Sequence, residues 1–83
     1  MNNANRVFEI INVLSGAENI TESCELVNDL GMDSIEMVAL LIEIEEGFDI
    51  RLDESDMNPF DLITVGDVVK LVDKYFNREH SHG

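Results

Sequence analysis

Apolar residues recur at the spacing of an α-helix in three stretches of the chain, about residues 7–14, 34–48 and 65–76. Each stretch predicts a longer helix with one apolar side that packs into a core. The residues expected to be buried are Val7, Phe8, Ile10, Ile11 and Leu14 in the first helix, Met37, Leu40, Leu41, Ile44 and Phe48 in the second, and Val65, Val68, Val69, Val72 and Phe76 in the third.

Two connections interrupt this pattern. Residues 17–32 sustain no period and are predicted to form a long loop, held down by isolated apolar side chains. Residues 53–56 begin a short third helix or turn, which Asn58 limits because the residue before a proline is pushed out of the α region. The apolar anchors of this segment are expected to be Met57, Phe60, Leu62 and Ile63.

The predicted fold class is therefore all-α. We expect a small four-helix bundle, with three longer helices, one short third helix, and a long loop between the first and second helices. Residues 1–77 are predicted to form one domain. Residues 78–83 are polar and aperiodic, which predicts a disordered tail. The sequence indicates no role for His80 and His82 in this tail, or for Cys24.

A serine lies at the N-terminus of the predicted second helix. Asp33 is a good N-cap, and Glu36 completes a capping box three residues later. Gly31, in the loop just before this cap, can adopt a positive φ. Ser34 is then the first helical residue, where an esterified phosphate would lie near unpaired N–H groups and be stabilised by up to ~1 kcal/mol when exposed. Ser34 is therefore a candidate attachment point for a phosphodiester.

Apolar residues also occur on the side of the second helix that faces away from the core. With about 100° of rotation per residue, Ile35, Ala39 and Ile42 fall nearly opposite the predicted buried stripe. The carboxylates around this strip belong to Glu36, Glu43, Glu45 and Glu46. An apolar strip rimmed by carboxylates is typical of a docking surface for proteins that present Lys and Arg.

Composition narrows the possible functions. The 83 residues carry a formal net charge of -13, which disfavours nucleic acid and anionic membrane surfaces as partners. No apolar run is long enough to predict a transmembrane helix. The single cysteine allows no internal disulfide, which fits a reducing cytoplasm, and no metal site is expected. An enzyme is not expected, because no histidine outside the tail could act as a base for Ser34.

Residues 30–35, with the sequence LGMDSI, and the acidic helix after them resemble the modification site of the acyl carrier protein family. The resemblance extends from Phe8 to Phe76. It implies that Ser34 receives 4'-phosphopantetheine from coenzyme A, and that the thiol of this arm carries acyl groups as thioesters. It also implies that Asp33 contacts the modifying transferase and its metal ion. In fatty-acid carriers the acyl chain shelters between the helices, and the corresponding lining residues would be Val38, Leu41, Ile44, Leu62 and Val68.

The same resemblance implies the partners and the setting. The partners would be a phosphopantetheinyl transferase and acyl-transferring or synthase enzymes with basic docking patches. The protein itself is expected to be a monomeric carrier in the cytoplasm. The implied pathways are fatty-acid and lipid biosynthesis. Ala39 replaces a glutamate that many primary fatty-acid carriers have on the docking face, and the segment between Leu52 and Val65 is slightly longer than theirs. Both differences favour a specialised pathway, such as polyketide or lipopolysaccharide synthesis, or aminoacyl or peptidyl delivery.

Two readings from other classes stay open on the residues alone. An unmodified acidic adaptor would use the second helix only to bind a basic protein. An acidic mimic of nucleic acid is disfavoured by Ile35 and Ile42, because such a surface would present a continuous row of carboxylates. A mass measurement after treatment with coenzyme A and a transferase separates the carrier from the adaptor.

Overall fold

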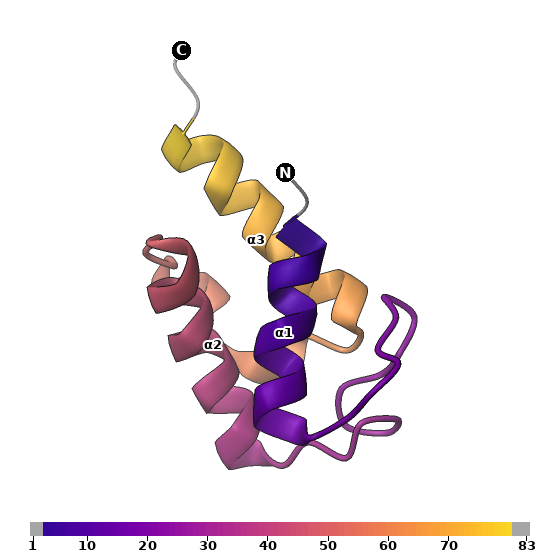
Figure 1. The fold of residues 1–83 in the computed structure, drawn as a ribbon. Helices are drawn as coiled ribbons and strands as arrows, with labels where there is room; N and C mark the ends of the chain where they lie inside the picture. The colour runs from indigo at the N-terminus through magenta and orange to yellow at the C-terminus, as the bar shows by residue number, and fades with distance from the viewer. Residues whose placement is uncertain (1–2, 81–83) are drawn as a thin grey trace.

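A computed structural model describes residues 3–80 and shows three α-helices in this part of the chain. They are α1 (Asn3–Ser15), α2 (Ser34–Phe48) and α3 (Val65–His80), drawn in Figure 1. Between α2 and α3 lie two turns of 3-10 helix, η1 (Glu54–Asp56) and η2 (Pro59–Asp61). Residues 3–80 contain no β-strand, only an isolated antiparallel bridge between Glu25 and Thr64. The predicted all-α class is confirmed.

The helices bury their apolar stripes against one another. All five residues predicted for the buried side of α2 are buried, which confirms the helical rotation assigned to it. In α1, Val7 and Ile11 are fully buried together with Ala4, whereas Phe8, Ile10 and Leu14 are partly buried at the edge of the core. The valines of α3 are buried with Leu71 and Tyr75, and Phe76 packs at the edge. No helix in residues 3–80 is both long and apolar enough to cross a membrane.

The short third helix is not a helix of the α type. Asn58 keeps an extended conformation before Pro59, with φ -89° and ψ 105°, and its side chain accepts a hydrogen bond from the backbone N–H of Phe60 at 3.1 Å. The segment therefore makes two separate 3-10 turns, and the predicted count of four helices becomes three α-helices with η1 and η2.

The apolar anchors predicted for this segment are also partly wrong. Leu62 is buried, but Phe60 and Ile63 are 57% and 53% exposed, and Met57 is 37% exposed. η2 ends at Asp61, and Leu62 after it is extended, with φ -93° and ψ 110°. Successive residues of an extended segment point to opposite sides, so Leu62 packs inward and Ile63 is exposed.

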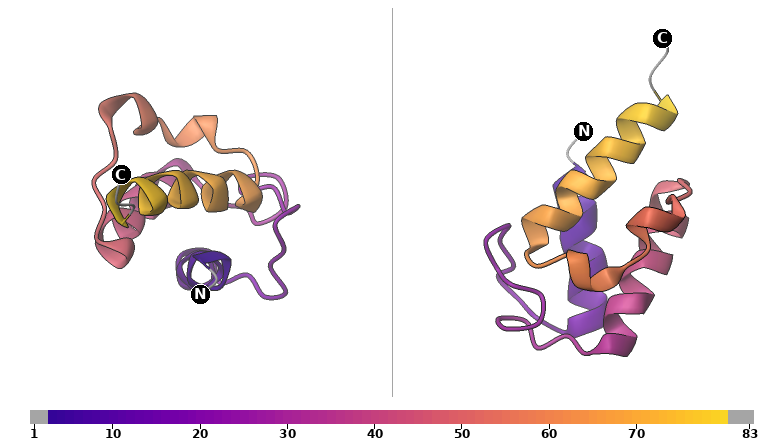
Figure 2. Two further views of the ribbon diagram at one scale, coloured as in Figure 1. Left: turned by 90° about the horizontal axis from the view of Figure 1, so that it is seen from above. Right: turned by 180° about the vertical axis from the view of Figure 1, so that it is seen from behind.

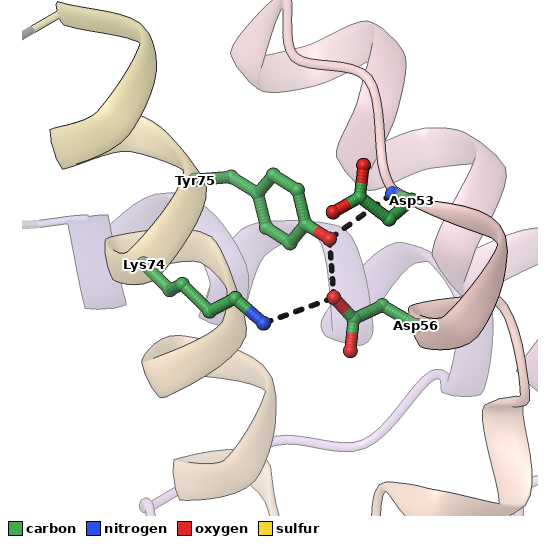
Figure 3. A network of polar contacts seen from close by, with 4 residues as sticks. All are labelled: Asp53, Asp56, Lys74 and Tyr75. Atoms are coloured by element: carbon green, nitrogen blue, oxygen red, sulfur yellow. Dashed lines mark hydrogen bonds and ion pairs between the residues drawn. The ribbon is translucent and has the colours of Figure 1, made fainter.

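A polar network fastens η1 to α3 (Figure 3). The hydroxyl of the buried Tyr75 accepts a hydrogen bond from the backbone N–H of Asp53 at 3.0 Å and donates one to the Asp56 carboxylate. The Lys74 ammonium pairs with the same carboxylate at 3.0 Å. Burial and the Asp56 carboxylate raise the pKa of Tyr75 above its ordinary value of 10.0. We call Asp53, Asp56, Lys74 and Tyr75 the α3 latch.

Backbone hydrogen bonds attach the connection between α1 and α2 to the start of α3. Leu26 N–H donates to the Ile63 carbonyl at 2.9 Å, and Val65 N–H donates to the Cys24 carbonyl at 2.9 Å. The chain then returns so that α1 and α2 run in opposite directions, with the end of α1 beside the start of α2 (Figures 1 and 2). At the other end of the chain, residues 78–80 of the predicted tail lie within α3, and residues 81–83, including His82, lie outside the described residues.

Candidate functional site

The start of α2 is fixed by a reciprocal pair of hydrogen bonds. Asp33 Oδ1 accepts from the N–H of Glu36 at 2.8 Å, and Glu36 Oε1 accepts from the N–H of Asp33 at 3.0 Å. This is the predicted capping box, which is confirmed. Gly31 has φ 69°, in the left-handed region that was predicted to be open to it. Met32 is only 2% exposed and holds the chain against the core just before the cap.

These contacts leave Ser34 as an exposed first residue of α2. The first N–H groups of an α-helix have no partner within the helix, and they give its N-terminus a partial positive charge. A phosphate ester on Ser34 Oγ would lie in this field with solvent on its outer side. The residues present therefore fit a phosphate-linked group, and the buried Met32 gives its attachment point a fixed base.

The strip next to Ser34 is apolar and open to solvent. Ile35 is 78% exposed and Ile42 is 46% exposed, whereas Ala39 is half-buried. The structure adds Val38, which is 49% exposed. The interpretation of Val38 as a residue between the helices is therefore wrong. Its helical angle, about 40° from Ser34, lies outside the buried stripe and next to the exposed strip. We call Ile35, Val38, Ala39 and Ile42 the α2 face.

The carboxylates around the α2 face differ in their surroundings. Glu43 and Glu46 are exposed. Glu36 is half-buried and its carboxylate serves the cap of α2. Glu45 is also half-buried, and its Oε2 accepts a hydrogen bond from the backbone N–H of Leu52 at 2.9 Å, which secures the chain after α2. Glu43 and Glu46 are thus the carboxylates that a partner could reach most directly.

Positive charge is absent from the chain around the start of α2. No lysine or arginine occurs in residues 7–50 or 52–69. The five lysine and arginine residues belong to the beginning of α1, to the segment after α2, and to α3. Figure 1 shows all three of these parts away from the start of α2. The end of the molecule that carries Ser34 therefore has an uncompensated negative field, which would orient an approaching cationic surface.

The start of α3 has a cap of its own. Asp67 Oδ2 accepts from the backbone N–H groups of Ile63 at 3.0 Å and Thr64 at 3.1 Å, and Asp67 N–H donates to Thr64 Oγ1 at 3.1 Å. The hydrogen bonds from Thr64 and Ile63 lower the pKa of Asp67 below 3.8. This cap holds the backbone of Ile63 in place although the Ile63 side chain is exposed.

Comparison with known proteins gives a matching family and similar acyl carrier proteins, two of which are described here. The family described as "Phosphopantetheine attachment site" matches residues 6–72. An acyl carrier protein from Thermotoga maritima is 36% identical over 55 residues, which cover 66% of this chain and 65% of that protein, just under two thirds of its length. An acyl carrier protein from Desulforapulum autotrophicum is 39% identical over 57 residues, which cover 69% of this chain and 71% of that protein.

Proposed function

Because this chain belongs to the phosphopantetheine attachment-site family of carrier proteins, whose members bear a covalent 4'-phosphopantetheine, we propose that the arm is attached at Ser34. The arm supplies the thiol on which acyl groups travel as thioesters. The protein supplies the attachment point and a surface that partner enzymes recognise. We propose a monomeric cytoplasmic carrier formed by residues 1–77, acting in fatty-acid, lipid or specialised acyl transfer; an aminoacyl or peptidyl cargo is the alternative.

The observation that carries this proposal is the exposure of Ser34 at the capped N-terminus of α2. Intact mass spectrometry after incubation with coenzyme A and a broad-specificity phosphopantetheinyl transferase tests it. We expect a single gain of about 340 Da, located by fragmentation in the peptide that contains Ser34. An unmodified adaptor, which could use the same α2 face, would gain no mass, and that outcome would reject the carrier function.

Asp33 has a structural role as the cap, and the family resemblance adds a contact with the transferase. The substitution Asp33→Ala is expected to lower the free energy of unfolding by about 1 kcal/mol, because Glu36 N–H loses its acceptor. The substitution Asp33→Asn keeps a capping oxygen and is expected to change stability by only a few tenths of a kcal/mol. Chemical denaturation measures both values.

The Asn variant then separates the two roles of Asp33. If the carboxylate meets the transferase and its metal ion, Asp33→Asn should be modified much more slowly than the wild type despite its stability. Equal rates of modification would limit Asp33 to its capping role.

The α2 face and its carboxylates are proposed as the docking site for the transferase and for synthase enzymes with basic patches. The substitution Glu46→Lys is expected to reduce kcat/KM for modification by about tenfold at low salt, equivalent to about 1.4 kcal/mol. The effect should enter through KM and shrink in 1 M salt, because exposed charges are screened there.

A matched control is Glu54→Lys, which makes the same change of charge at an exposed position of η1, close to the end of α2 remote from Ser34. It should leave kcat/KM nearly unchanged. If both substitutions had the same effect, net charge rather than the α2 face would govern docking.

A further inference from the structure

An apolar groove lies between α1 and α2, and we call it the α1–α2 groove. It has a volume of about 220 Å³ and is lined by Glu9, Ile10, Val13, Leu14 and Glu43. The left-hand view in Figure 2 looks along α1 and shows no other helix of residues 3–80 on the side of α1 that faces away from α3. Val13 is 80% exposed, so the groove is open to solvent.

The apolar wall of the groove follows from the helical spacing of α1. Ile10, Val13 and Leu14 stand at i, i+3 and i+4, so they lie on one side of the helix. With about 100° of rotation per residue, Val13 lies about 140° from the middle of the buried pair Val7 and Ile11. Packing into the core therefore accounts for the half-buried Ile10 and Leu14 but not for Val13.

The opposite wall belongs to α2, and a glycine fixes its distance from α1. A Cβ atom added at Gly47 would lie 3.3 Å from Ile10 Cδ1, which is tighter than ordinary van der Waals contact. The absence of a side chain thus lets Ile10 pack directly against α2. Because the two walls are held by this contact, a partner would meet a groove that is already formed.

Two carboxylates stand at the groove without a cation. Glu9 on α1 and Glu43 on α2 are exposed, and neither takes part in an ion pair or a side-chain hydrogen bond within residues 3–80. No lysine or arginine lines the groove. Arg6, the one cation of α1, lies beside Gly47. Basic side chains of a partner would therefore be attracted to both walls.

The volume of the groove limits its occupant to one large side chain. If each carbon takes roughly the 30 Å³ share of a water molecule, 220 Å³ accepts about seven carbons. A phenylalanine side chain has this size. An aromatic anchor in an apolar pocket, with charged groups around it, is typical of the residues that dominate binding in protein interfaces.

We propose that the α1–α2 groove is a second docking surface for proteins. Its occupant is an amphipathic helix that inserts one aromatic side chain between α1 and α2 and places Lys or Arg beside Glu9 and Glu43. This surface is distinct from the α2 face, because Glu43 lies about 80–100° around α2 from Ile35 and Ile42. A partner in the groove therefore leaves the α2 face open to an enzyme.

An NMR titration of the methyl-labelled full chain tests the proposal. The probe is a synthetic alanine-based helical peptide with one central phenylalanine and a lysine one turn to either side of it. The methyl signals of Ile10, Val13 and Leu14 should shift and saturate, while those of Ile35 and Ile42 should shift much less. A peptide with alanine in place of the phenylalanine should bind about tenfold more weakly, and one with glutamates in place of the lysines should not bind.

Two variants test the two walls of the interaction. Val13→Ser removes an exposed apolar side chain and should weaken peptide binding by about fivefold. Glu9→Lys should weaken it by about tenfold at low salt. The matched controls are Ile35→Ser on the α2 face and Glu54→Lys on η1, both at exposed positions, and both should bind the peptide like the wild type.

Three outcomes would overturn the proposal. Shifts centred on Ile35 and Ile42 would place the peptide on the α2 face, and an absence of saturable shifts would leave the groove without this occupant. Equal weakening by Glu9→Lys and Glu54→Lys would assign the binding to net charge. The titration uses the chain before treatment with the transferase, so its result does not depend on attachment of the arm at Ser34.

Discussion

Replacing Ser34 by alanine should abolish the gain of about 340 Da that the transferase produces in the wild-type protein. The proposed attachment of the arm is a phosphoester, and alanine has no hydroxyl to form one. Loss of fold is not the expected cause, because Ser34 is exposed at the first position of α2 and alanine is the best helix former. We expect the free energy of unfolding to change by less than about 0.5 kcal/mol.

The control for this prediction is Ser55→Ala, which removes an exposed hydroxyl in η1 and should leave the mass gain unchanged. Circular dichroism melting curves of both variants verify that they fold. A mass gain that survives Ser34→Ala would assign the arm to a different side chain and contradict the proposed site. The docking role of the α2 face would then have to be tested separately.

The substitution Tyr75→Phe should lower the free energy of unfolding by about 2 kcal/mol, because it removes two hydrogen bonds of the α3 latch, one of them to a carboxylate. The Tyr75 ring is 0% exposed, and its hydroxyl serves both the Asp53 N–H and the Asp56 carboxylate. Phenylalanine fills the same space, so the loss reports on the hydroxyl. For a domain of this size, the melting temperature should fall by about 8–16 °C.

Lys74→Gln provides the comparison within the same latch. The Lys74 side chain is 53% exposed, and an ion pair with that exposure is worth about 0–1 kcal/mol. The lysine variant should therefore cost less than the tyrosine variant. If Lys74→Gln cost more, the latch would depend on the ion pair rather than on the buried hydroxyl.

The pH dependence of stability gives a second readout of the α3 latch. The pKa of Tyr75 is raised above 10.0 by burial and by Asp56, so the protonated phenol is favoured in the folded state. Its contribution is fully present below the unfolded pKa and is lost as the pH rises through the folded pKa. The difference in stability between wild type and Tyr75→Phe should therefore narrow above pH 10, as measured by denaturation across alkaline pH. A constant difference would contradict this linkage.

The α3 latch lies partly outside the family match. The family match ends at residue 72, so Lys74 and Tyr75 lie beyond it, on the last turns of α3. Their partners Asp53 and Asp56 lie between Leu52 and Val65, the segment that was expected from the sequence to be slightly longer than in fatty-acid carriers. The latch thus joins a segment inside the family match to residues beyond it.

Most of the proposed attachment site could be predicted from the sequence, because its determinants are local. The capping box joins residues three apart, and the buried stripe of α2 follows from a rotation of about 100° per residue. The positions of Asp33, Ser34 and Glu36 relative to one another therefore follow from their neighbours along the chain. Gly31 could likewise be assigned its positive φ, since glycine lacks the Cβ that makes this conformation costly.

The tertiary structure decided what depends on distant residues. Tyr75 meets Asp53 and Asp56 across separations of 22 and 19 residues, and no periodicity in the sequence relates them. Phe60 and Ile63 were expected to be apolar anchors, but Phe60 is exposed on η2, and the extended backbone after η2 buries Leu62 and leaves Ile63 exposed. Local hydrogen bonds and helical rotation determine where Ser34 stands, whereas only the packing of separate segments determines which surfaces surround it.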